Sequence, residues 1–344
     1  MKRIVLTGGG TAGHVTPNIA LLPALQAAGY EIAYVGSYEG IEKKLIADFN
    51  IPYTGISTGK FRRYLDPKNF SDPFRVMKGF VEARNYLKNY QPDVVFSKGG
   101  FVSVPVVRAA ASLHIPCIIH ESDMTPGLAN KLCIPVAEKV CCNFPETMKN
   151  IPADKAVLTG SPIRAELAEG SKLAGLNMCG FTANKPVIMV IGGSLGAANV
   201  NKAVRDALPK LLEDFQVVHL CGKDKIDNLL LNTPGYKQFE YIKAELKDIF
   251  AMADIVISRA GANAICELLA LKKPNILIPL PAASSRGDQL LNAASFEAQG
   301  YSIVLNEDDI TTNLLVDKVH ELYFNRQNYV DAMSKSHQMD AVKT

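Results

Sequence analysis

The chain of 344 residues is 48% hydrophobic and 21% charged, with a formal net charge of +3. It is longer than one ordinary domain and has enough apolar residues to form buried cores, so the composition excludes a disordered chain and predicts two domains. No apolar run reaches the roughly 18 to 20 residues that span a bilayer, and the start lacks a signal-peptide pattern, so we expect a cytoplasmic protein. Seven cysteines without a CxxC pair indicate neither a disulfide framework nor a zinc site.

Apolar segments of strand length alternate with helical patterns along most of the chain. This alternation is typical of parallel α/β proteins, in which strands buried on both faces read as nearly continuous apolar runs. The predicted strands lie at residues 2–7, 31–36, 93–97, 117–120, 187–192, 216–222, 254–258 and 275–280.

The chain contains an internal repeat. Residues 93–100, DVVFSKGG, are matched by residues 254–261, DIVISRAG, and each segment runs through a helical pattern to a strand that begins at a proline. A strand, a glycine turn and a helical pattern also occur twice, at residues 2–17 and 187–199. The repeat indicates that one architecture was built twice.

We therefore predict an α/β protein with two Rossmann-like parallel-sheet domains, residues 1–160 and 161–325. Ligands of such sheets bind outside the carboxyl ends of the strands, so the two domains are expected to face a cleft that holds the site. A C-terminal helix at about 326–344 can pack back on the first domain.

The first glycine turn allows several interpretations. Residues 8–13, GGGTAG, fit GxGxxG after a strand and before a helix, which is the fingerprint of dinucleotide binding. A nicotinamide enzyme would also need an acidic residue at the end of the second strand, which instead ends in Gly36 and Ser37. A P-loop is disfavoured because His14 occupies the place of the phosphate-binding lysine.

The second glycine turn, residues 192–196, fits the GxSxG nucleophile elbow of α/β hydrolases and follows a strand as that motif requires. A serine at a helix start can equally bind a phosphate through its hydroxyl and nearby N–H groups. Labelling with a fluorophosphonate distinguishes the two interpretations, because only a hydrolase would have a reactive Ser194.

A transferase whose two substrates both carry phosphate would use both turns. Seven motifs resemble, in order, the MurG family of N-acetylglucosaminyltransferases, which complete lipid II in bacterial cell-wall synthesis. The resemblance implies a GT-B fold, UDP-N-acetylglucosamine as donor, a polyprenyl-diphosphate lipid (undecaprenyl-diphosphate-N-acetylmuramoyl-pentapeptide) as acceptor, and inverting transfer. The motifs are GGTAGHVTP, FSKGGFVSVP, HESDMTPGLANK, TGSPIR, GGSLGAANVN, SRAGANAICE and GDQLLNA.

The resemblance places the donor in the second domain. Glu267 lies in an otherwise apolar helix, where its carboxylate can accept hydrogen bonds from both ribose hydroxyls. Gly193 and Ser194 are implied to meet the diphosphate, and Gln289 the sugar hydroxyls. The other residues carried over are Arg164, Ile242, which would face uracil through its backbone, and Ala262, Asn263 and Ala264.

The resemblance places the acceptor in the first domain. Its diphosphate is implied to lie against the first glycine turn, where the helix dipole favours negative charge. Asp123 stands where many members of the family have asparagine. The acceptor-binding residues are Gly10, Thr11, Ala12, Gly13, Asp123 and Asn130.

Inverting transfer needs a base that takes the proton of the attacking hydroxyl, and imidazole suits this task, typically contributing ~10²- to 10⁴-fold. His14 is one candidate, although it can also simply hydrogen-bond a phosphate. Glu121 is the other. With His120 it resembles the start of HExxH, but Met124 occupies the second histidine position, so no zinc site is predicted. No metal or other cofactor is expected.

Residues 60–90 carry eight Lys/Arg against three acids, a net charge of +5, and seven aromatic residues. A helix from Pro73 would pack one apolar stripe on the sheet and expose a second one, ringed by positive charge, to anionic lipid. A UDP-N-acetylglucosamine 2-epimerase of the same architecture would not need such a segment. We expect a peripheral protein on the cytoplasmic face of the cell membrane, with no nucleic-acid partner. A cell-wall assembly complex is a candidate protein partner. The predicted membrane residues are Phe74, Arg75, Lys78 and Phe80.

Overall fold

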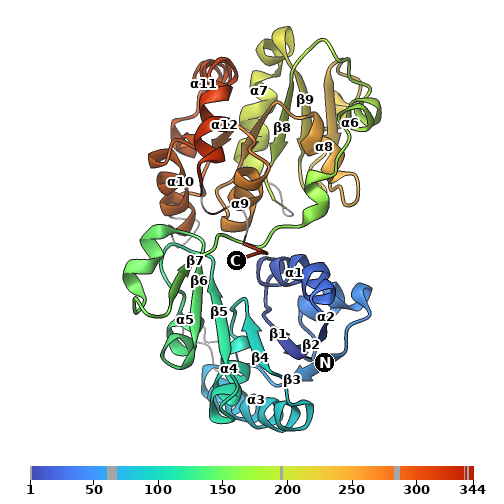
Figure 1. Cartoon of the computed structure of the whole chain (residues 1–344). Helices are drawn as coiled ribbons and strands as arrows, with labels where there is room; N and C mark the ends of the chain where they lie inside the picture. The colour runs from blue at the N-terminus through green and yellow to red at the C-terminus, as the bar shows by residue number, and fades with distance from the viewer. Residues whose placement is uncertain (1, 60–67, 194–196, 283–286, 337, 339–340) are drawn as a thin grey trace. The chain divides into compact units, whose positions relative to one another are not determined.

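The computed structural model describes residues 2–59, 68–193, 197–282, 287–336, 338 and 341–344, and only the backbone of residues 68–73. Contacts between residues divide the chain into two compact units (Figure 1), residues 1–164 with 340–344 and residues 165–339. The helix expected at about 326–344 is α12, Arg326–Ser334, which belongs to the second unit. The boundary expected at residue 160 stays a prediction.

The first unit is built on a seven-stranded parallel sheet with the order β3-β2-β1-β4-β5-β6-β7. The chain moves outward from β1 to β3 and then returns to the other side of β1, so the strand order reverses between β1 and β4. The loops after these two strands therefore open onto the crevice where such sheets bind ligands. The strands are β1 (Lys2–Thr7), β2 (Tyr30–Ser37), β3 (Tyr53–Ile56), β4 (Val94–Ser97), β5 (Cys117–Glu121), β6 (Lys139–Cys142) and β7 (Ala156–Leu158).

Both faces of this sheet are covered by helices, which explains the continuous apolar runs. Val5 of β1 packs into a core with Ala83, Leu87 and other residues on one face, whereas Ile4 and Leu6 pack into a second core on the other. Helices α3 (Lys68–Tyr90), α4 (Ser103–Ser112) and α5 (Leu128–Cys133) contribute to the first core. Helices α1 (Thr16–Ala27) and α2 (Ile41–Ile46) contribute to the second.

The second unit repeats this plan with a six-stranded parallel sheet in the order β10-β9-β8-β11-β12-β13. Strand β8 takes the place of β1, and β11 takes the place of β4, so the sequence repeat corresponds to equivalent strands. The prediction of two Rossmann-like parallel-sheet domains is confirmed. The strands are β8 (Val187–Ile191), β9 (Gln216–Leu220), β10 (Tyr236–Phe239), β11 (Ile255–Ser258), β12 (Asn275–Leu277) and β13 (Ser302–Val304).

Helices α7 (Ala198–Asp214) and α11 (Thr312–Phe324) cover one face of the second sheet, where Val204 and Val319 join Ile188 and Ile257 in one core. Helix α8 (Leu246–Met252) packs against β8 and against α6 (Lys172–Cys179). The remaining helices of this unit named below are α9 (Ala262–Ala270) and α10 (Asp288–Ala298). The short 3-10 helices include η1 (Ala12–His14), η2 (Ala47–Phe49), η3 (Ile134–Val136), η4 (Pro145–Asn150), η5 (Ala165–Ala168), η6 (Asn228–Leu230) and η8 (Glu307–Asp309).

Among the described helices, none combines the length and the apolar character that crossing a membrane requires.

Candidate active site

The first glycine turn joins β1 to η1 and α1. Gly8 and Gly10 have φ angles of 154° and 84°, which side chains with a Cβ rarely adopt, so glycine is required at both positions. The buried Asn18 donates a hydrogen bond to the Thr7 carbonyl (3.1 Å), and the Tyr34 hydroxyl donates one to the Gly8 carbonyl (2.6 Å). The turn is thus fixed from within the unit while its tip stays exposed. The exposed residues are Gly10, Thr11 and Ala12.

Glu42 of α2 ties this turn to the end of β2. Its carboxylate is fully buried and accepts hydrogen bonds from the Gly10 N–H (3.1 Å), the Ser37 N–H (2.9 Å) and the Ser37 hydroxyl (2.5 Å). The acidic residue that the dinucleotide interpretation required is therefore near β2, but both of its oxygens are used by this chain. Glu42 was not predicted from the sequence. Its position in the first turn of a helix that follows a strand was the available signal.

His14 ends η1 and is partly buried. Its Nδ1 lies 3.1 Å from the Gly9 carbonyl oxygen and 3.1 Å from the Thr11 hydroxyl. Because a carbonyl can only accept, Nδ1 carries the proton and Nε2 carries the lone pair. Burial, and then the positive charge of Lys98, lower the pKa of His14 to about 4. The imidazole is therefore neutral near pH 7 and can accept a proton at Nε2.

A buried lysine lies beneath this site. Lys98 follows β4 and is 1% exposed, and its ammonium donates hydrogen bonds to His120 Nδ1 (2.7 Å) and the Ser122 hydroxyl (2.5 Å). His120 Nε2 donates in turn to the Gly160 carbonyl (2.8 Å). Burial and the charge of Lys98 hold the pKa of His120 well below its ordinary value. The sequence analysis missed Lys98, although a basic residue follows the matching serine in both repeats.

Glu121 is held by three donors. Its carboxylate is buried and accepts hydrogen bonds from the Asp123 N–H (2.9 Å), the Gly127 N–H (3.0 Å) and the Asn130 amide (2.8 Å). These three bonds engage both carboxylate oxygens and fix the loop after β5. This geometry favours a positioning role for Glu121 and leaves His14 as the better candidate base.

The loops after β1, β4 and β5 meet at one edge of the sheet. The Gly9 N–H donates to the Gly99 carbonyl (3.3 Å), and a Cβ at Gly100 would collide with the Gly9 carbonyl oxygen. Gly99 in turn lies against the Asn130 side chain, which bonds to Glu121. The loop after β4 therefore connects the predicted acceptor residues that follow β1 with those that follow β5. Among the described residues, no cluster of His, Cys, Asp and Glu suits a metal ion.

The predicted donor residues lie at the carboxyl ends of the second sheet. Gly193 follows β8 in the left-handed conformation (φ 82°) and is exposed, while Ser194 lies outside the described residues. Glu267 is partly exposed on α9, one turn after the helix start that holds Ala262, Asn263 and Ala264. Gln289 of α10 accepts a hydrogen bond from the Leu280 N–H (3.1 Å), which fixes the loop after β12.

Two further predicted donor residues differ in exposure. The Ile242 side chain is 5% exposed, so a ligand in this loop would meet its backbone, as expected for contact with uracil. Arg164 is partly buried. It belongs to the first unit and directly precedes the second unit, which begins at Ala165.

Arg259, which the sequence analysis also missed, braces the donor loops. It is 9% exposed, forms an ion pair with Glu307 and donates hydrogen bonds to the Ile278 (3.1 Å) and Pro279 (3.2 Å) carbonyls. The buried Asn292 amide donates to the Ala260 carbonyl (3.2 Å). These bonds hold together the loops after β11 and β12 and the start of α10.

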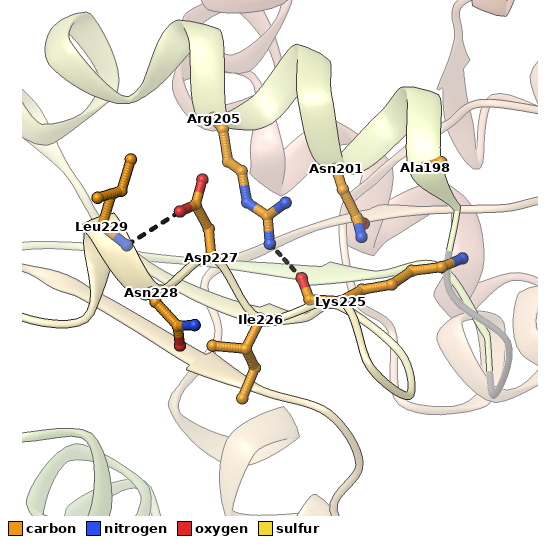
Figure 2. A pocket seen from close by; sticks show the side chains of 8 residues that line it. All are labelled: Ala198, Asn201, Arg205, Lys225, Ile226, Asp227, Asn228 and Leu229. Atoms are coloured by element: carbon orange, nitrogen blue, oxygen red, sulfur yellow. Dashed lines mark hydrogen bonds between the residues drawn. The ribbon is translucent and has the colours of Figure 1, made fainter.

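A recess of about 470 Å³ lies beside the first half of α7 (Figure 2). The Arg205 guanidinium points into its wall and donates hydrogen bonds to the Lys225 carbonyl (2.6 Å) and the Gln238 side chain (2.9 Å). The Asp227 carboxylate accepts from the Leu229 N–H (3.0 Å). These polar groups of the recess are hydrogen-bonded within the protein, and no predicted donor residue lines the recess.

Comparison with known proteins identifies the family. The glycosyltransferase family 28 N-terminal domain matches residues 4–142, and the glycosyltransferase family 28 C-terminal domain matches residues 187–344. The chain belongs to glycosyltransferase family 28. Membership in this family decides between the transferase and hydrolase interpretations of the second glycine turn in favour of the transferase.

Similar proteins match this chain over almost its whole length. Proteins of Lachnospira eligens (65% identical, 99% of this chain and 97% of the relative) and Lachnoclostridium phytofermentans (66%, 99% and 96%) are named UDP-N-acetylglucosamine--N-acetylmuramyl-(pentapeptide) pyrophosphoryl-undecaprenol N-acetylglucosamine transferase. The crystal structure of Acinetobacter baumannii MurG matches with a TM-score of 0.78 and 28% identity, covering 100% of this chain and 97% of that one. The resemblance to the MurG family and the GT-B fold class are confirmed.

Proposed function

We propose that the protein transfers N-acetylglucosamine from UDP-N-acetylglucosamine to undecaprenyl-diphosphate-N-acetylmuramoyl-pentapeptide, lipid I, and so forms lipid II for peptidoglycan synthesis. The observation that carries this proposal is full-length identity of 65% and 66% to relatives named for the reaction. Two glycine turns at equivalent places in two Rossmann-like units support it, because each substrate carries a diphosphate.

The acceptor reacts in the first unit. The exposed tip of the first turn faces the lipid-linked diphosphate, and His14 Nε2 takes the proton of the attacking sugar hydroxyl. The hydroxyl oxygen bonds to the anomeric carbon of the donor as the bond to UDP breaks, and UDP leaves with the electron pair. Because the attack comes from the face opposite UDP, the configuration inverts. A role for His14 in binding phosphate instead stays open.

The donor binds in the second unit. Glu267 accepts hydrogen bonds from the ribose hydroxyls, Gly193 and Ser194 meet the diphosphate, and Gln289 contacts the sugar. The braces made by Arg259 and Asn292 support this assignment, because they fix the chain after β11 and β12, which leads into α9 and α10, the helices that carry Glu267 and Gln289.

The protein binds the cytoplasmic membrane surface through α3. The side chains of Phe74, Met77 and Val81 are 75%, 68% and 54% exposed, whereas Ala83 and Leu87 are fully buried in the core. A recess of about 510 Å³ with almost entirely apolar walls lies between α3 and α4, with Lys78 and Arg108 among its lining residues. An apolar patch edged by cations supports docking on anionic lipid.

One residue of the predicted membrane set needs correction. Phe80 is partly buried and packs against the core of the first unit, so it belongs mainly to the stripe that faces the sheet. Phe74 and Met77 are therefore the better positions at which to test membrane binding.

Mass spectrometry of a reaction with UDP-N-acetylglucosamine and a lipid I analogue tests the activity. We expect a disaccharide lipid whose mass exceeds that of the acceptor by one N-acetylglucosamine residue. UDP-glucose and an acceptor without its diphosphate serve as controls and should yield little product. Absence of the disaccharide lipid in the complete reaction would contradict the proposed function.

A further inference from the structure

A second recess in the first unit takes part neither in the proposed reaction nor in the proposed membrane contact. Its volume is about 480 Å³, and it lies at the carboxyl ends of β2 and β3, on the same edge of the sheet as the first glycine turn. Most of its lining side chains are polar or charged. They include Ser37, Tyr38, Glu39, Ser57, Thr58 and Arg75.

The walls of this recess are held in place by Glu82 of α3. The Glu82 carboxylate accepts hydrogen bonds from the Ser57 N–H (2.6 Å), the Ser57 hydroxyl (3.3 Å) and the Tyr38 hydroxyl (3.2 Å), and it lies 3.7 Å from the Lys78 ammonium. Burial alone would raise the pKa of Glu82, but these donors and the lysine lower it overall. The recess is therefore formed before any ligand arrives.

Two charges of opposite sign border the recess without a partner in the described part of the chain. Arg75 of α3 and Glu39 of the loop after β2 are both exposed, and neither takes part in an ion pair or a side-chain hydrogen bond there. A ligand that carries both a carboxylate and N–H donors could pair with both residues.

The recess is also linked to the first glycine turn through Glu42. The Glu42 carboxylate that accepts from the Gly10 N–H also accepts from the N–H and hydroxyl of Ser37, which lines the recess. One buried side chain thus fixes the tip of the turn and the start of the recess together. Because the turn and the recess lie on the same edge of the sheet, we expect a branch of a ligand bound at the turn to extend toward the recess.

We propose that this recess binds the peptide stem of the acceptor, with Arg75 pairing with a peptide carboxylate and Glu39 accepting from a peptide N–H or ammonium group. This inference rests on the proposed function, in which the acceptor diphosphate lies at the glycine turn. The polyprenyl chain has no groups that could pair with these charges, and the hydroxyls of a sugar carry none. The peptide is the part of the acceptor whose chemistry matches the recess.

Steady-state kinetics with two soluble acceptors tests this inference. Both carry the same short lipid diphosphate, but one has the pentapeptide and the other only its first residue. The assays contain detergent and no vesicles, so membrane binding by α3 does not contribute. The variants are R75Q and E39Q, and E138Q serves as the control because Glu138 is exposed and lies away from the recess.

We expect R75Q and E39Q each to raise the KM of the pentapeptide acceptor about 3- to 10-fold, the loss typical of one charge-assisted hydrogen bond at an exposed site. The KM of the trimmed acceptor and the KM of UDP-N-acetylglucosamine should not change, and E138Q should behave as the wild type. In the wild type, trimming the peptide should itself raise the acceptor KM.

Two results would overturn the inference. If both acceptors weaken equally in R75Q and E39Q, the recess serves the diphosphate or the sugar rather than the peptide. If neither variant changes either KM, the recess does not take part in acceptor binding. If the wild type glycosylates neither acceptor, the proposed function fails, which is a separate outcome.

Discussion

His14 is the residue on which the proposed chemistry depends. Its Nδ1 proton is engaged by the Gly9 carbonyl, so the lone pair is on Nε2, and burial together with the charge of Lys98 lowers its pKa to about 4. We expect H14A to lower kcat by about 10²- to 10⁴-fold, as loss of a general base does, with little effect on the KM of the donor. Steady-state kinetics checks this. A kcat near that of the wild type would reduce His14 to a structural residue.

Lys98 should tune His14 through its charge. The charged groups that influence the imidazole are Lys98, which lowers its pKa, and Glu42, which raises it. In K98M the pKa of His14 should therefore rise, and the acidic limb of the pH profile of kcat/KM should move to higher pH. The wild-type profile should stay flat down to the pH at which the fold is lost. An acidic limb at the same pH in both proteins would show that Lys98 does not act through His14.

The residues found from the sequence differ from those found only in the structure. His14 and Glu267 were predicted because each stands in a motif that resembles the family, His14 after the first glycine turn and Glu267 in an otherwise apolar helix. Glu42 and Lys98 were not, because their partners, Ser37 with Gly10 and His120 with Ser122, are set by the order of strands in the sheet rather than by local pattern. Buried polar contacts of this kind depend on topology that a single sequence only implies.

At the scale of elements, α9 is expected to carry the nucleoside contact. Glu267 lies one turn beyond the start of a helix whose other side packs into the unit, so its position is well fixed. We expect E267A to weaken UDP binding by about 1.5 to 3 kcal/mol, the range for hydrogen bonds to a charged group. Titration calorimetry measures this, with E297A on an exposed face of α10 as the control. Equal UDP affinity of E267A, E297A and the wild type would show that Glu267 does not contact UDP.

Helix α3 is expected to act as the membrane contact. Changing Phe74 and Met77 to serine removes two exposed apolar side chains without disturbing the core, so binding to anionic vesicles should fall at least about tenfold. Sedimentation with vesicles measures this, and binding of the wild type should weaken as salt rises. F324S is the matched control, because Phe324 is also 75% exposed but lies in the second unit. Loss of binding in F324S alone, or equal binding to neutral vesicles, would contradict the assignment.

Elements were predictable to different degrees. Strands such as β1 and β8 read clearly from the sequence because both faces are buried and the apolar runs are long. Strands β3, β6, β7, β10 and β13 were not predicted, although β4, β11 and β12 are equally short and were. Four of the missed strands, β3, β7, β10 and β13, lie at the edges of the two sheets, where a strand is less enclosed and its apolar pattern is weaker. Helix α3 begins at Lys68, before the proline at which the apolar pattern starts.

At the scale of the whole molecule, three buried histidines should make the protein sensitive to acid. Burial is the main cause that lowers the pKa of His14 to about 4, that of His219 to about 3, and that of His120 well below 6.5. Above pH 6.5 these groups are neutral in both the folded and the unfolded chain, so they do not change the free energy of unfolding. As the pH falls below 6.5, the unfolded chain takes up protons that the folded chain excludes, and stability is lost down to the folded-state pKa values.

The first unit holds two of these histidines and the second unit holds one, so the first should lose more stability in acid. By this reasoning His14 and His219 each cost roughly 2 kcal/mol between about pH 6.5 and pH 5, and His120 adds a loss in the same direction. Hydrogen exchange at the amides of β1 and β8, corrected for the intrinsic rate, follows the two units separately. A larger loss of protection in β8 than in β1 would contradict the expectation.

The two-unit plan was predictable because the repeat of residues 93–100 at 254–261 marks equivalent strands, β4 and β11. The recess bordered by Arg75 and Glu39 was not, because its walls come from three segments that only the fold brings together.

The most direct test of the central claim is proton NMR of a reaction that contains UDP-N-acetylglucosamine and a lipid I analogue. The account predicts UDP and a β-linked disaccharide in equal amounts, because the α-linked donor sugar is inverted by a single displacement. Formation of an epimerised UDP-sugar, or of free N-acetylglucosamine without consumption of the acceptor, would contradict it.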